Sequence, residues 1–473
     1  MIIMTSIKTN FIYSSILTTA NYIFPLITYP YVSRVLGVTN IGICNFVDSI
    51  INYFSMFSLM GIVAVGIRSI AAVKSDKEEL SKTFSNLLFL NAISTFIVLL
   101  VLCISIIFIS KFYEYKELMS IGVVKIIFTF LTIDWLYKGL EEFRYITITG
   151  IIIKIGYVIS IFTFVKAPND YTIYYFLSVL MIVMCALINI CHSRSFVKLN
   201  AKIKLCSLKP YIRPFLTIGV YVLLTSMYTS FNIVFLGFVC NETEVGYYTT
   251  ATKLHAIFIG MFSAFTGVML PRMSSLLSEN QTEIFKQTIN KSLSILYAFA
   301  LPIVIFSEIY APQIINVIAG SGYNLAITPM RIVMPLILII GFEQIFVLQI
   351  LMPMKQDKQI LVGACAGAFV GLICNILLVN MFKSKGSAMA WLLSELIVLI
   401  ASRHFSKKMI GFSIQAKKII QQSLLSIPFI IILLLAKGVI SNNYISLMVG
   451  MIIITIYYLI IYLFTMKYKI ISD

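Results

Sequence analysis

The chain has 473 residues, of which 60% are hydrophobic and 12% carry a charge, and its formal net charge is +17. This composition excludes an ordinary soluble globular protein, in which charged residues make up about a quarter of the chain. Apolar stretches of about 20 residues, each long enough to cross a bilayer, follow one another and leave no segment for a soluble domain.

We predict an all-α polytopic membrane protein with about fourteen transmembrane helices. The predicted spans are, in chain order, roughly 10–33, 41–66, 86–110, 117–137, 145–166, 172–191, 214–238, 246–270, 290–310, 327–352, 359–382, 385–402, 420–437 and 443–465. The first apolar run is too long for a signal peptide and is followed at once by another span, so we interpret it as a span.

Most of the 36 Lys and Arg residues fall in alternate loops. The positive-inside rule assigns the richer side to the cytoplasm, which makes both termini cytoplasmic. We therefore attribute the net positive charge to the orientation of the chain in the membrane, and we expect no nucleic acid partner. Anionic lipid headgroups are the first partners expected for such basic loops.

The longest polar connector, roughly 192–213, divides the chain, and a loose repeat supports that division: Leu36-Gly37 and Gly42 recur as Leu236-Gly237 and Gly246. We predict an N-lobe of six spans, a basic cytoplasmic linker, a C-lobe of six spans, and two further spans with a cytoplasmic C-terminus, with boundaries at 1–191, 192–213, 214–402 and 403–473. Six spans per lobe give both lobes the same orientation, so we expect pseudo-symmetric lobes around a central cavity.

Three glycines in the eleventh span follow one stripe of the helix, Gly363, Gly367 and Gly371. Small residues at this spacing let two membrane helices approach closely. We therefore predict tight packing of this span against a neighbouring helix.

Ionisable residues inside spans are costly and mark candidate functional sites. The candidates are Asp48, Lys125, Asp134, Lys154, Lys253, His255, Arg331, Glu343 and Glu395. The cations suit an anionic substrate such as a pyrophosphate, because charge-assisted bonds are strong in a low dielectric. Glu343 and Glu395 are candidates for ion coupling or gating.

Asp48 and Lys253 lie six or seven residues past the repeated glycines, so we expect them at similar depth in the membrane. We expect their side chains to face each other across the cavity. They either contact the substrate or form an ion pair that joins the two lobes. Lys125 and Asp134 are nine residues apart, so on a single helix they would point about 180° away from each other. We therefore expect that they do not both line the same cavity. We expect His255 to be a partner-bonded helix residue, with a proton relay as the alternative.

The sequence contains no GxxxxGK[ST] or HExxH motif and no loop large enough for an ATPase or transferase site, which predicts a transporter and not an enzyme. The cysteines form no CxxC pair, so we expect no metal site and no cofactor. Whether H⁺ or Na⁺ serves as a coupling ion is left open.

Four segments carry a family resemblance: Pro25 to Gly37, Gly66 to Ala71, Asp134 to Phe143, and Gly246 to Leu254. On these the chain resembles the polysaccharide-unit flippases of the O-antigen (Wzx, RfbX) type. Their superfamily, the multidrug/oligosaccharidyl-lipid/polysaccharide exporters, also holds drug extruders and the lipid II flippase.

The resemblance implies movement of an undecaprenyl-pyrophosphate-linked oligosaccharide across the bacterial cytoplasmic (inner) membrane by alternating access. It implies a lipid-linked oligosaccharide substrate and, as partners, a polysaccharide polymerase and a chain-length regulator. Carried over by residue, it makes Arg34, Arg68 and Lys253 candidates for anion contact, and Asp48 and Asp134 candidates for coupling. Arg34 and Arg68 could equally be interfacial anchors.

Two alternatives are left open: a cation-coupled multidrug antiporter of the same superfamily, and a non-transporting scaffold of a glycan assembly complex. A polysaccharide polymerase would need a large extracytoplasmic loop, and the longest one expected here, 311–326, is too short. The scaffold predicts that glycan export survives neutralisation of Lys253 and Asp48.

Overall fold

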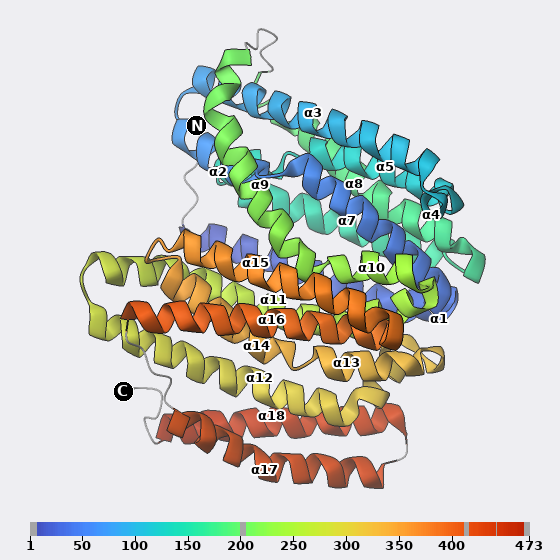
Figure 1. Ribbon diagram of the computed structural model, residues 1–473, viewed down its shortest axis with the longest axis vertical. Helices are drawn as coiled ribbons and strands as arrows, with labels where there is room; N and C mark the ends of the chain where they lie inside the picture. The colour runs from blue at the N-terminus through green and yellow to red at the C-terminus, as the bar shows by residue number, and fades with distance from the viewer. Residues whose placement is uncertain (1–6, 199–204, 411–415, 441, 468–473) are drawn as a thin grey trace. The chain divides into compact units, whose positions relative to one another are not determined.

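The computed structural model describes residues 7–198, 205–410, 416–440 and 442–467. Within these residues the regular structure is helical throughout (Figure 1). Both ends of the chain and residues 199–204 of the predicted basic linker lie outside the described part. Helices satisfy every backbone hydrogen bond within one segment, which is what a chain crossing a bilayer needs.

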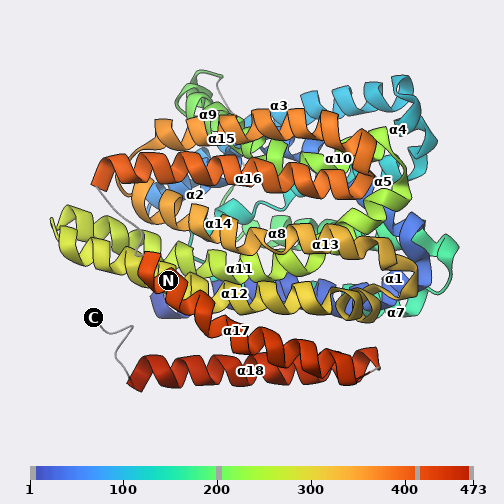
Figure 2. The same cartoon turned by 60° about the horizontal axis from the view of Figure 1, so that its bottom comes forward.

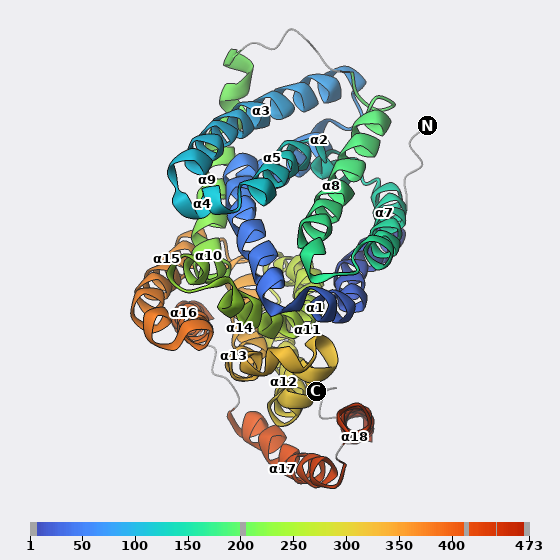
Figure 3. The ribbon, with the colours of Figure 1, turned by 90° about the vertical axis from the view of Figure 1, so that its right-hand side faces the viewer.

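The chain divides into an N-terminal unit, Met1–Ser226, and a C-terminal unit, Met227–Asp473. The N-terminal unit contains α1 (Ile7–Leu59), α2 (Ile62–Val73), α3 (Lys77–Phe108), α4 (Ser110–Glu114), α5 (Lys116–Leu131), α6 (Asp134–Gly139), α7 (Phe143–Phe164) and α8 (Tyr171–Ser193). Helix α1 packs against α3, α5 and α7, and α5 lies beside α8 (Figure 3). The division falls inside α9 (Lys209–Thr229).

The C-terminal unit continues with α10 (Phe231–Val239), α11 (Glu242–Ser278), α12 (Thr282–Ala319), α13 (Ile327–Val333), α14 (Leu336–Gln344), the π-helix η4 (Ile345–Leu351), α15 (Asp357–Cys374), the π-helix η5 (Asn375–Val379), α16 (Asn380–Ile410), α17 (Ala416–Val439) and α18 (Asn443–Lys467). Helices α17 and α18 lie side by side and both pack on α12 (Figure 2). Lys437 on α17 donates to the Ile309 carbonyl of α12 at 2.5 Å.

Ten helices are long and apolar enough to cross a membrane in the described part of the chain. Two of them, Ile12–Val73 and Asp357–Ile410, are long enough for two crossings. The first is interrupted at Gly37 and the second at Lys383, where the backbone angles are not helical. The bent pair α9 and α10 and the shorter apolar helix Ser426–Val439 add two more. The predicted polytopic all-α fold is confirmed, and the helices counted in this way agree with fourteen spans.

The segments of the predicted repeat occupy corresponding helix ends in the two units. Gly37 lies at the break in α1, where its φ of 76° is readily adopted only by glycine, and Gly42 is buried just beyond it. Gly237 lies near the end of α10, and Gly246 is buried in the first turns of α11.

Outward faces are apolar while hydrogen-bonded polar groups lie inside, as expected where lipid and not water surrounds the chain. On α3, Phe96 and Ile107 are exposed, whereas the buried Asn91 donates to the Ser58 carbonyl at 2.7 Å. In the C-terminal unit, the glycine stripe of α15 packs on α16 as predicted: a Cβ at Gly371 would lie 2.7 Å from Oγ of Ser394, and one at Gly367 would collide with Val398.

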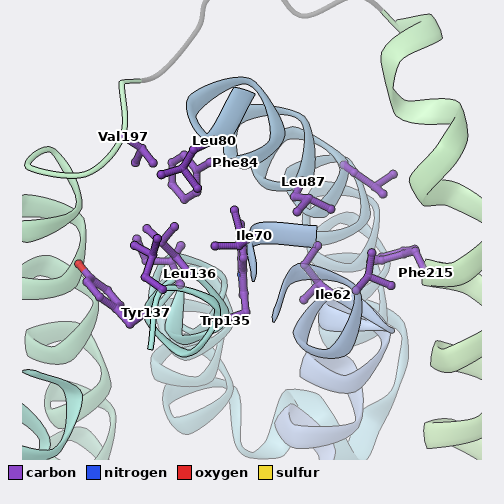
Figure 4. Packing of buried hydrophobic residues seen from close by; sticks show 14 of the residues in the cluster. Ile62, Ile70, Leu80, Phe84, Leu87, Trp135, Leu136, Tyr137, Val197 and Phe215 are labelled. Atoms are coloured by element: carbon purple, nitrogen blue, oxygen red, sulfur yellow. The ribbon is translucent and has the colours of Figure 1, made fainter. Parts of the chain in front are cut away.

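A large apolar cluster in the N-terminal unit joins α2, α3 and α6 (Figure 4). Trp135, on α6, packs its ring on Gly66 of α2, where a Cβ would lie 2.6 Å from the ring. Gly139 of α6 lies equally close to Ile70 of α2, since a Cβ at Gly139 would be 2.7 Å from the Ile70 side chain. Two of the segments that carry the family resemblance are therefore in direct contact through glycines.

Candidate functional site

A charged triangle lies between α1 and α5 in the N-terminal unit. Nζ of Lys125 is 2.5 Å from Oδ1 of Asp48 and 2.9 Å from Oδ1 of Asn52, and Nδ2 of Asn52 donates to Oδ2 of Asp48 at 3.0 Å. The Lys125 side chain is only 12% exposed. Each polar group of the triangle thus has a partner, which offsets the cost of placing charges in a membrane helix.

Local sequence explains why the triangle closes. Asp48 and Asn52 are four residues apart on α1 and therefore share one face. One turn before Lys125, Gly122 leaves room for Ile51, since a Cβ at this position would collide with that side chain. The predicted partner of Asp48, Lys253, belongs to the other unit, so that pairing stays a prediction, while the partner inside the unit is Lys125.

Asp134 lies at a break between two helices and not on the same helix as Lys125. Helix α5 ends at Leu131, and Ile133 has a φ of 43° just before α6 begins at Asp134. The expectation that a single helix turns Lys125 and Asp134 to opposite sides is therefore wrong, because it assumed an unbroken helix.

The amide of Asn189 on α8 holds this break together. Its Nδ2 donates to the Thr132 carbonyl at 2.7 Å and to Oδ1 of Asp134 at 3.2 Å. The Tyr145 hydroxyl donates to Oδ1 of Asn189 at 3.2 Å. The Asn189 amide thus supplies the hydrogen-bond donor that the Thr132 carbonyl lacks where α5 ends. A break in a membrane helix needs such a donor, because lipid offers none.

Three further candidate cations of the N-terminal unit bond to uncharged groups or lie at the surface. Lys154 on α7 donates to Oδ1 of Asn21 on α1, and Arg34 donates to the Pro30 carbonyl at 2.5 Å. Arg68 lies on the exposed side of α2. The amide partner does not neutralise the positive charge of Lys154, on which Asp134 also acts electrostatically.

In the C-terminal unit, Arg331 on α13 donates a hydrogen bond to a backbone carbonyl that lacks its helical donor because of a proline. Pro312 of α12 has no N–H for the Glu308 carbonyl one turn earlier, and Nε of Arg331 donates to that oxygen at 3.2 Å. Lys253 lies half-buried on α11, beyond the buried Gly246 and Thr250.

Glu343 on α14 and Glu395 on α16 come together inside the C-terminal unit, with their carboxyl groups in hydrogen-bonding range of each other. Glu395 is 2% exposed and accepts a hydrogen bond from Nε1 of Trp391 at 2.9 Å. His255 packs edge-on against Trp391 with ring centroids 5.0 Å apart, and its Nε2 has no hydrogen-bond partner among the described residues. That His255 is a partner-bonded helix residue stays a prediction, since only this one nitrogen is shown to lack a partner.

The sequence interpretation missed the neutral side chains that complete these clusters. Asn52, Asn189 and Trp391 each bond a candidate charged residue. Two signals were available: Asn52 follows Asp48 by four residues, and Trp391 precedes Glu395 by four, so both pairs share a helix face. Asn189 carries no such signal, because its partners come from a distant part of the chain.

Comparison with known proteins fits these observations. Residues 7–277, more than half of the chain, match the model of the family described as polysaccharide biosynthesis protein. A relative from Escherichia coli (strain K12) named "Putative O-antigen transporter" is 24% identical over 403 residues, covering 83% of this chain and 95% of that protein.

Solved structures share the fold over most of the chain. The structure "Lipid II flippase MurJ, inward closed conformation" has a TM-score of 0.81 at 15% identity, and the match covers 98% of this chain and all of the other. An inward-facing multidrug resistance MATE family transporter of the MOP superfamily has a TM-score of 0.60 at 14% identity, covering 87% of this chain and 96% of the other.

These findings confirm the resemblance found in the sequence. The fold is that of a transporter, and the relative is named as a transporter and not as an enzyme. The chain belongs to the polysaccharide biosynthesis protein family.

Proposed function

We propose that this protein is a flippase for lipid-linked glycans. It moves an undecaprenyl-pyrophosphate-linked oligosaccharide, the repeat unit of an O-antigen or capsule, from the cytoplasmic to the periplasmic leaflet of the bacterial cytoplasmic membrane. Both termini are cytoplasmic, and transport proceeds by alternating access of the two units. The O-antigen transporter name of the relative and the likeness to a lipid II flippase support this proposal.

The observation that carries the proposal is the set of cations inside membrane helices. Lys125, a poorly exposed cation, forms an ion pair with Asp48, and Lys154 donates to the neutral amide of Asn21. A diphosphate that reaches Lys154 replaces the neutral amide oxygen with charged phosphate oxygens, so that the ammonium group gains an ion pair. The apolar prenyl chain needs no such site, because it stays in lipid.

Each candidate residue has a role in this proposal. Arg34, Arg68, Lys125, Lys154, Lys253 and Arg331 contact the diphosphate or its approach path, and Asp48, Asp134, Glu343 and Glu395 couple or gate the change of access. Lys125 then alternates between Asp48 and the diphosphate. Anionic lipids bind the basic loops, and a polymerase and a chain-length regulator receive the exported unit.

Gene deletion and complementation test the proposal in cells. Deletion is expected to abolish surface polysaccharide while lipid-linked units accumulate facing the cytoplasm, where a sugar-specific lectin reaches them only after permeabilisation. The wild-type chain restores export and Lys253→Ala does not. Accumulated units that are already accessible from the periplasm in the deletion strain would contradict a flippase.

A drug antiporter is the second candidate, and the MATE-like fold favours it. It predicts that deletion sensitises cells to cationic drugs while surface polysaccharide is unchanged. A non-transporting scaffold differs from both, since it predicts full export with Asp48→Asn and Lys253→Ala combined.

A further inference from the structure

Two glutamates meet inside the C-terminal unit, at a place where the helices carrying them pack together. Glu343 is the penultimate residue of α14, Glu395 lies in the middle of α16, and α14 and α16 are in contact. Their carboxyl groups are in hydrogen-bonding range, and Glu395 is 2% exposed. Neither glutamate forms a salt bridge within the described residues.

Two ionised carboxylates cannot bond to each other, because each offers only acceptors. A buried pair of like charges is also unfavourable, and such pairs reduce their charge by holding one proton between them. With one proton, one carboxyl becomes a donor and the other an acceptor, so the contact between α14 and α16 becomes a hydrogen bond. Without the proton the same contact is a repulsion between two negative charges, that of the buried Glu395 and that of the half-buried Glu343.

The groups around the pair leave this charge uncompensated. From α11 come the imidazole of His255, against Trp391, and Tyr248, on whose hydroxyl Glu395 acts electrostatically. From α12 comes Tyr297, edge-on to Phe342 beside Glu343. Lys253 lies two residues before His255 and so on another side of α11.

The remaining elements packed against α14 and α16 bring no counter-charge to the pair. Arg331 of α13 bonds to the Glu308 carbonyl of α12. The sequences of α10, η4, η5 and residues 359–374 of α15 contain no Asp, Glu, Lys, Arg or His. The one charged neighbour that acts on Glu395 within the described part of the chain is Glu343.

The surroundings fit a proton better than a metal ion. Hard cations prefer a shell of several oxygen ligands. Here one oxygen of Glu395 already accepts the indole N–H of Trp391, and aromatic rings flank the pair. No group of three or more His, Cys, Asp and Glu side chains that could hold a metal ion occurs among the residues that the structure describes.

Helix α14 has a break at each end. Pro335 separates it from α13, and the π-helix η4 begins directly after Gln344. Short π segments often lie at functional sites, and prolines interrupt the hydrogen-bond ladder of a helix. Gln349 on η4 is fully buried, and both of its amide atoms lack a partner among the described residues, which is costly and favours a second arrangement of this segment.

We propose that Glu343 and Glu395 form a proton-binding site that holds one shared proton and joins α14 to α16 only while the proton is bound. Loss of the proton separates the two helices, and movement at Pro335 and η4 accommodates the change. This inference deepens the proposed flippase function, on which it rests, by naming the proton as the coupling ion and this pair as its site.

Trp391 provides an optical probe of the site, because it donates directly to Glu395 and the chain has only one other tryptophan. The full chain carrying Trp135→Phe is titrated with pH in nanodiscs, with no glycan present. We expect one transition in Trp391 emission with the steepness of a single proton. Glu395→Gln abolishes it, as does Glu343→Gln combined with Glu395→Gln.

The matched control is Glu244→Gln, another poorly exposed carboxyl of this unit, whose partners are Lys383 at 4.0 Å and the Ser384 amide. It leaves the transition unchanged. If Trp135→Phe fails to fold, the difference between wild-type and Trp391→Phe emission isolates the same signal. A transition that survives in Glu395→Gln, or one that follows Na⁺ at fixed pH, overturns the proton site.

A flipping assay in vesicles separates this site from the proposed function. We expect an imposed pH gradient to speed flipping several-fold in the wild type, and the double Gln variant to lose that dependence. A normal pH transition without any flipping contradicts the flippase alone. Flipping that depends on the gradient in the double variant overturns the coupling site alone.

Discussion

Asp48 and Lys125 form a 2.5 Å ion pair between α1 and α5, and Asn52 bonds to both partners. Lys125→Met removes the counter-charge of Asp48, whose side chain is 35% exposed and keeps its bond from Asn52, so this change is expected to destabilise the protein by about 1–2 kcal/mol. Asp48→Leu combined with Lys125→Met should cost less than the two single changes added together. Thermal unfolding in detergent measures all three variants.

An exposed ion pair supplies the control for this cycle. Lys74 and Glu141 are 2.8 Å apart, but their side chains are 39% and 46% exposed. Lys74→Met is expected to cost about 0–1 kcal/mol. Equal losses for Lys74→Met and Lys125→Met would show that burial gives the α1–α5 pair no special role in stability.

The contact of Gly66 with Trp135 gives a second prediction. A Cβ at Gly66 would lie 2.6 Å from the Trp135 ring, which is itself buried, so Gly66→Ala is expected to destabilise by about 1–3 kcal/mol. A Cβ at Gly156 on α7 would meet no atom within 4 Å beyond its own turn of helix, so Gly156→Ala is the matched control and is expected to cause no loss of stability, because alanine is the better helix former. A drop in melting temperature confined to Gly66→Ala is the predicted result.

The bond from Arg331 to the Glu308 carbonyl predicts a dependence on Pro312. Arg331→Ala leaves that carbonyl without its donor and is expected to cost about 0.5–1.5 kcal/mol. In a Pro312→Ala background the new backbone N–H can bond to the carbonyl, so Arg331→Ala should cost less. Denaturation of the wild type, of each single variant and of the double variant measures the free energy of unfolding that Arg331→Ala costs in each background.

The same four proteins separate a structural role of Arg331 from contact with substrate. If Arg331 touches the diphosphate, Arg331→Ala slows flipping equally with Pro312 or Ala at position 312. Recovery of flipping in the Pro312→Ala background would show that Arg331 acts through the helix alone.

The fold was predictable because lipid imposes one requirement along the whole chain. Apolar runs of sufficient length predicted the spans, and the glycine stripe from Gly363 to Gly371 predicted close packing, which the structure shows against α16. Hydropathy does not register local breaks, however. The break at Ile133 was therefore missed, and the relation of Lys125 to Asp134 was wrongly inferred from an unbroken helix.

The candidate site was predictable as a set of residues but not as a set of contacts. Charges in apolar runs stand out in a sequence, which is how Asp48, Lys125, Glu343 and Glu395 were found. Which of them meet depends on how helices far apart in the chain pack. The contact of Glu343 with Glu395 joins residues 52 positions apart in sequence and needed the structure.

Reconstitution tests the central claim most directly. The purified chain is placed in vesicles that contain a fluorescent undecaprenyl-pyrophosphate-linked oligosaccharide, and a membrane-impermeant quencher reports how fast the lipid changes leaflet. We expect the wild type and Lys291→Ala, a change at an exposed position of α12, to flip it. Lys253→Ala is expected to be slower by about tenfold, equivalent to about 1.4 kcal/mol in the barrier. A wild-type rate equal to that of protein-free vesicles would contradict the account.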